Sequence, residues 1–195
     1  MTETPVYETF VSETAIVRAA QSAGLTVLAQ ARWPQDDPAE LSPSPGFVYS
    51  SFSPLVAATA GRCLAQWYGA APLPPQVGRR VALVLVSVRG HADLAPSEGG
   101  DGWLSPLLFS QSANAVLGHI ATGWGICGPL LCTSPVTEPE TDALALASGV
   151  LALGDADTVL VVLAEPACAH DEQDWSHAVL VRPATWPRDV LGRGA

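Results

Sequence analysis

Valine- and leucine-rich runs alternate along this chain with segments whose apolar residues recur at helical spacing. Four runs predict strands, at residues 79–90, 130–136, 157–165 and 177–183. The first three show little alternation of apolar and polar residues, which is typical of strands buried on both faces of a sheet.

Three segments predict long helices, at residues 53–69, 111–124 and 138–153. The first begins with Ser53, which can cap a helix, and Pro54, which suits the first helical position. The third has an acidic first turn, which favours the positive end of a helix dipole.

Residues 14–31 fit a helix followed by a strand (LTVLAQARW), with Gly24 between the two. Loops rich in proline or glycine are predicted at 34–46, 71–78 and 97–102. Strands that alternate with helices indicate an α/β layered fold. The 195 residues show no internal repeat and are most simply one domain spanning 1–195.

Charge is scarce in this chain, at 14% of residues, while 48% are hydrophobic. Such a composition predicts that part of the surface is covered by a partner, although alanine-rich chains can show it without one. The net charge of −10 argues against nucleic acid and anionic membranes as partners. All nine cationic residues are arginines, and no patch for docking an acidic carrier protein is evident.

Four cysteines, at positions 63, 127, 132 and 168, lack the spacing of a zinc site, so we expect buried free thiols and neither metal nor cofactor. No apolar run is long enough to span a bilayer. The acidic start of the chain does not resemble a targeting segment, and we expect a cytoplasmic protein.

Residues 109–147 carry the most specific pattern. Asn114, Gly118, Ile120 and Ala121 match N-x-x-x-G-x-I-A, and Gly125 begins GICGP, followed by a strand and an alanine- and leucine-rich helix. In this order the motifs resemble the middle of a β-ketoacyl synthase. The match covers residues 47–165, and its first long helix is similar to that of chain-length-factor-like relatives. The resemblance implies the first half only of a thiolase fold, as an α/β/α layered unit.

Thr137 occupies the position of the nucleophilic cysteine, counted without a gap from Gly128-Pro129. A threonine hydroxyl lacks the thiolate character that acyl transfer there requires. The family's two catalytic histidines belong to second-half motifs that this sequence does not contain, and its own four histidines have other neighbours. We therefore expect no condensation by this chain alone. From the residues themselves, Thr137 is expected to cap the helix 138–153 in a T-x-x-E capping box with Glu140.

Ketosynthase homologues without the active cysteine are known as chain-length factors, which pair with a catalytic ketosynthase in polyketide and aryl-polyene synthesis. The resemblance implies such a partner, with an acyl carrier protein as a further candidate. It also implies that the heterodimer interface and the acyl-chain tunnel use the strand 130–136 and the helix 111–124. The residues expected at the tunnel or interface are Phe109, Ser112, Ala113, Asn114, Val116, Leu117, Ile120, Leu130, Leu131, Cys132 and Val136, and those expected in structural turns are Gly118, Gly125, Gly128 and Pro129.

Two alternatives stay open. The chain could be a diverged thiolase-fold acyltransferase that uses Cys127 or Cys132 with His119, provided that a positive neighbour lowers the pKa of the thiol. It could also be a homodimer that binds an acyl chain or buries the same face against itself.

Overall fold

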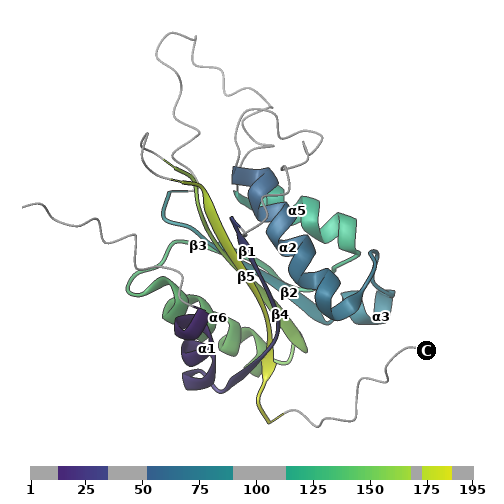
Figure 1. Cartoon of the computed structure of the whole chain (residues 1–195). Helices are drawn as coiled ribbons and strands as arrows, with labels where there is room; N and C mark the ends of the chain where they lie inside the picture. Colours follow the sequence, from purple (N-terminus) through teal and green to yellow (C-terminus); the bar gives the residue numbers. More distant parts are fainter. Residues whose placement is uncertain (1–12, 35–51, 90–112, 168–172, 186–195) are drawn as a thin grey trace, which may run out of the picture.

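Within the part of the chain that the structure describes, five strands form one mixed sheet in the order β1-β5-β4-β2-β3 (Figure 1). The computed structural model describes residues 13–34, 52–89, 113–167 and 173–185. Strands β2, β3 and β4 are parallel, while β5 runs antiparallel to both β4 and β1. The strands are β1 (Leu25–Trp33), β2 (Val81–Val86), β3 (Leu130–Thr133), β4 (Thr158–Glu165) and β5 (Trp175–Pro183).

Helices cover both faces of this sheet (Figure 1). One face carries α2 (Phe52–Tyr68), α5 (Ala113–Trp124) and the single-turn α3 (Pro75–Gly78), and the other carries α1 (Glu13–Ser22) and α6 (Pro139–Ala152). This arrangement confirms the predicted α/β/α layered fold class.

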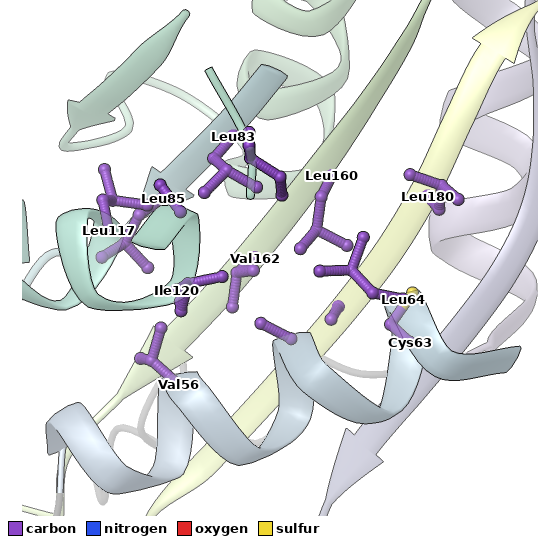
Figure 2. Packing of buried hydrophobic residues seen from close by; sticks show 14 of the residues in the cluster. Val56, Cys63, Leu64, Leu83, Leu85, Leu117, Ile120, Leu160, Val162 and Leu180 are labelled. Atoms are coloured by element: carbon purple, nitrogen blue, oxygen red, sulfur yellow. The ribbon is translucent and has the colours of Figure 1, made fainter. Parts of the chain in front are cut away.

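The sheet divides the core in two because successive side chains of a strand point to opposite faces. Leu83, Leu85 and Leu160 pack with α2 and α5, as Figure 2 shows. Val84 and Val161 pack on the other face with α1 and α6. Every residue of β2 and β4 is buried, which confirms the interpretation of these runs as central strands.

Several boundaries differ from the sequence-based expectations. The helix predicted from Ser53 begins at Phe52, so Ser53 lies within its first turn, where its hydroxyl is buried and has no hydrogen-bond partner. The segment 71–78, predicted as a loop, contains α3. The predicted loop 97–102 and nearly all of 34–46 lie outside the described residues.

Candidate functional site

The loop between β3 and α6, residues 134–138, contains Thr137 and lies at the carboxyl ends of the parallel strands. The hydroxyl of Ser134 donates a hydrogen bond to the carbonyl of Ser87 at 3.0 Å. The amide of Ser87 donates to the carbonyl of Thr133 at 3.2 Å. The loop is thus anchored to the end of β2, at the edge of an open α/β sheet where ligands commonly bind.

Asp142, in the first turn of α6, holds Thr137 through two hydrogen bonds. Its Oδ1 accepts the Thr137 hydroxyl at 2.6 Å, and its Oδ2 accepts the amide of Thr137 at 2.7 Å and that of Val136 at 2.6 Å. The hydrogen bonds from Thr137 and Val136 lower the pKa of the Asp142 carboxyl. The carboxylate therefore serves as the anion that the end of this helix favours.

The predicted capping box is wrong. Helix α6 begins at Pro139 with Glu138 as its N-cap residue, and no side chain supplies a cap hydrogen bond. Thr137 precedes the cap position, so its hydroxyl turns to Asp142 instead of a backbone amide of α6. Proline at the first helical position has no N–H to satisfy, which reduces the need for a side-chain cap.

Glu165 joins the same strand ends from the last position of β4. Its buried carboxylate accepts the hydroxyl of Ser87 at 3.2 Å, the amide of Val88 at 2.5 Å and the amide of Arg89 at 2.8 Å. This network fixes the chain where it leaves β2. Sequence reasoning missed it, although an acidic residue that ends a buried strand was a visible signal.

Three acidic residues, Glu138, Glu140 and Asp142, lie at the end of the loop and in the first turn of α6. Burial raises the pKa of Glu140, and the charge of Glu138 raises it further, although a hydrogen bond from the backbone of Glu140 opposes this. The hydrogen bonds that Asp142 accepts from Thr137 and Val136 lower its pKa and so favour its charged form. A negative charge that developed at Thr137 would therefore meet like charges.

Strand β3 is an exposed edge strand, which corrects the expectation that 130–136 is a buried strand. It ends at Thr133, and among the described residues it pairs with β2 alone. The side chain of Leu130 is 44% exposed and that of Val136 is 92% exposed, whereas Leu131 and Cys132 are partly buried. Apolar residues at a sheet edge leave a surface that another chain can cover.

The residues of α5 proposed for the tunnel have different surroundings. Val116, Leu117 and Ile120 are buried in the core cluster that also contains residues of α2 and the sheet, where Figure 2 labels Leu117 and Ile120, and Asn114 is exposed. Ala113 is the first residue of α5, and Phe109 and Ser112 lie outside the described residues. Their assignment to a tunnel stays a prediction.

The turn between α5 and β3 passes close to neighbouring backbone. Gly125 has a φ of 68°, which favours glycine, and a Cβ on Gly128 would collide with the carbonyl oxygen of Val81. The carbonyl of Pro129 accepts the amide of Leu83 at 2.9 Å, just before β3 pairs with β2. These contacts support a structural role for the turn, whereas a Cβ on Gly118 would meet open space.

The thiols differ in exposure. Cys127 is exposed, so the expectation of buried thiols is wrong there, and Cys168 lies outside the described residues. Burial raises the pKa of the partly buried Cys132, and it raises that of Cys63 to about 12, which disfavours both thiolates. His119, the histidine considered as a partner for Cys127 or Cys132, is exposed.

Within the described ranges, no cluster of three or more histidine, cysteine or acidic residues is placed to hold a metal ion. No helix in those ranges combines the length and apolar character that a membrane span needs.

No protein-family model matches the sequence, and no curated protein matches it either. Two of the solved structures that are similar to this fold serve as comparisons. One is the ishigamide ketosynthase/chain length factor, with a TM-score of 0.58 and 16% identity over 80% of this chain and 50% of that one. The other is the ketosynthase ApeO in complex with its chain length factor ApeC from Xenorhabdus doucetiae, with a TM-score of 0.57 and 15% identity over 82% of this chain and 79% of that one.

This chain thus spans about half the length of the first of these structures and most of the second. Identities this low carry information about the fold, and that fold includes the five-stranded sheet with helices on both faces. The resemblance noted in the sequence is confirmed at this level: the chain has the fold of the ketosynthase and chain-length-factor proteins.

Proposed function

We propose that this chain is a non-catalytic, chain-length-factor-like subunit that pairs with a catalytic β-ketoacyl synthase. In this role it helps to shape the acyl-chain tunnel during polyketide or polyene synthesis. The observation that carries the proposal is the state of Thr137. Its hydroxyl and amide are both engaged by Asp142, at the position that the motif spacing assigns to the nucleophile.

The chemistry of Thr137 argues against acyl transfer at this position. A hydroxyl needs an adjacent general base to become a nucleophile, and a histidine commonly provides it. The Thr137 hydroxyl donates its hydrogen bond to the Asp142 carboxylate, whose lowered pKa makes it a weak base. This supports a partner role in which another subunit carries out the condensation.

The surface at β3 supports pairing with another chain. Among the described residues β3 pairs with β2 alone, and exposed apolar residues lie at its start, Leu130, and beyond its end, Val136. A chain with few charged residues and such an edge is suited to lasting association. The similar ketosynthase ApeO is in complex with its chain length factor ApeC, and a pairing of this kind is the one we propose here.

The test is co-purification with a ketosynthase encoded near the gene of this chain, followed by size-exclusion chromatography with light scattering. We expect a heterodimer whose ketosynthase subunit alone becomes acylated by an acyl-carrier thioester. The variants Leu130→Arg and Val136→Arg should weaken the complex at least tenfold, because they place unpaired charge in an apolar interface.

Leu153→Arg is the matched control. Leu153 is also exposed, at 77%, but it follows the opposite end of α6 from Thr137, so this variant should bind normally. If the chain forms a homodimer and does not bind the ketosynthase, the result would favour the alternative of a self-associating acyl-chain-binding protein. Acylation of this chain itself would contradict the proposal.

A further inference from the structure

The polar groups of Thr137 are arranged around a built-in anion. The hydroxyl and the amide of Thr137, together with the amide of Val136, all donate to the two oxygens of Asp142. Amides that precede a helix are suited to binding an anion from a ligand. Here the first turn of α6 supplies that anion from within the chain, so these three donors are already engaged.

We propose that Asp142 is a second determinant of inactivity at this loop, independent of the missing thiol. Its carboxylate already accepts the hydrogen bonds of the groups that could otherwise stabilise a negative charge at residue 137. It would also repel a thiolate placed there. This inference deepens the proposed function and rests on its assignment of Thr137 to the nucleophile position.

The geometry shows that two features oppose a reactive group at residue 137: the missing thiol and the neighbouring Asp142 carboxylate. The side-chain oxygens of Thr137 and Asp142 lie 2.6 Å apart, so a cysteine sulfur at residue 137 would sit beside a carboxylate. A neighbouring like charge disfavours ionisation of a thiol, whereas reactive cysteines have electropositive surroundings. Restoring cysteine at residue 137 should therefore not restore a reactive thiol.

The effect of the hydrogen bonds between Thr137 and Asp142 can be separated from the effect of nearby negative charge. Glu140 lies on the same helix turn as Asp142 and carries the same type of side chain, but its hydrogen bond is to its own backbone amide. Neutralising Glu140 would remove a nearby charge without releasing Thr137. Removing the Asp142 carboxylate would do both, whereas Asp142→Asn removes the charge and keeps one oxygen that can accept a hydrogen bond.

The test compares three variants of the full chain: Thr137→Cys alone, with Asp142→Asn, and with Glu140→Gln. Iodoacetamide is the probe, since the thiolate displaces iodide and forms a stable thioether. Peptide mass spectrometry gives the alkylation rate at residue 137, with the exposed Cys127 as an internal standard. Rates measured between pH 6 and 10 give the pKa of the new thiol.

We expect Asp142→Asn to increase the rate at pH 7 about tenfold, which corresponds to a shift of about one pKa unit. We expect Glu140→Gln to change it less than about twofold, as for a screened charge without direct contact. Equal effects of the two neutralisations, or no effect of Asp142→Asn, would overturn the proposal.

A second measurement does not depend on the cysteine variant. In the wild-type chain, the amides of Val136 and Thr137 should be protected from hydrogen exchange, and Asp142→Ala, which removes both acceptor oxygens, should accelerate their exchange at least tenfold, with α5 unaffected as the internal reference. Unchanged exchange at both amides would overturn the proposal. Both measurements use this chain alone, so failure to bind a ketosynthase would refute the proposed function and leave this inference standing.

Discussion

The hydroxyl of Ser87 donates a hydrogen bond of 3.2 Å to the buried carboxylate of Glu165, which links the ends of the parallel strands β2 and β4. The same carboxylate, in a residue only 7% exposed, also accepts the amides of Val88 and Arg89. One side chain thus satisfies three donors at the point where the chain leaves the sheet.

Replacing Glu165 by alanine should destabilise the protein by about 3 kcal/mol, because buried donors would lose their acceptor. Chemical denaturation measures the loss. Glu138→Ala is the control, since Glu138 is exposed and its removal should change stability by less than about 0.5 kcal/mol. Equal stabilities of the two variants would show that the Glu165 network contributes nothing.

His177 should make the protein sensitive to mild acid. Its side chain is 1% exposed, its Nε2 has no hydrogen-bond partner, and burial, with a smaller effect of the Arg32 charge, lowers its pKa to about 4. The unfolded chain binds the proton near pH 6.5, whereas the folded chain does not bind it until about pH 4. Stability from this residue is therefore complete above pH 6.5 and is lost as the pH falls towards 4.

Between pH 7.5 and pH 5 the loss should be about 2 kcal/mol, and His177→Leu should remove this part of the pH dependence. Urea denaturation of both proteins at the two pH values gives the comparison. If the wild-type chain and the variant lose the same stability between the two pH values, this role of His177 is refuted.

Gly128 and Gly149 should respond in opposite ways to a methyl group. Gly128→Ala brings a Cβ into the carbonyl of Val81 and should destabilise the protein by about 2–3 kcal/mol. Gly149 lies inside α6, where a Cβ meets open space, so Gly149→Ala should stabilise the isolated chain by up to about 1 kcal/mol. Thermal unfolding separates the two, and a neutral Gly128→Ala would show that the turn can move.

The described thiols should react in order of exposure. A disulfide reagent should label Cys127 first and Cys132 more slowly, and should reach Cys63 only on unfolding, because Cys63 is buried and its pKa is raised to about 12. Incubation with an acyl-carrier thioester should leave no stable acyl group on Cys127 or Cys132. Such an adduct, found by mass spectrometry, would favour the acyltransferase alternative.

Much of the fold was predictable from residues alone. The unbroken apolar runs around Val84 and Val161 correctly indicated central strands, since only a strand covered on both faces can be apolar at every position. The segment Leu25–Trp33 was also correctly predicted as a strand after a short helix. Local patterns carry this information because they reflect burial along one element.

The strand at Leu130 was misjudged for the converse reason. Its apolar residues suggested burial, but β3 stands at the edge of the sheet and is half exposed. Position within a sheet depends on pairing between segments far apart in sequence, and no local pattern reports it.

The sequence by itself determined the layered α/β class, the central strands and the placement of threonine where the motif spacing expects a thiol. Only the tertiary structure decided what that threonine does. The capping box predicted from adjacent residues does not form, because the Thr137 hydroxyl donates to the carboxylate of Asp142 in the first turn of α6. Hydrogen bonds follow distances in space, and the path of the loop between β3 and α6 sets those distances.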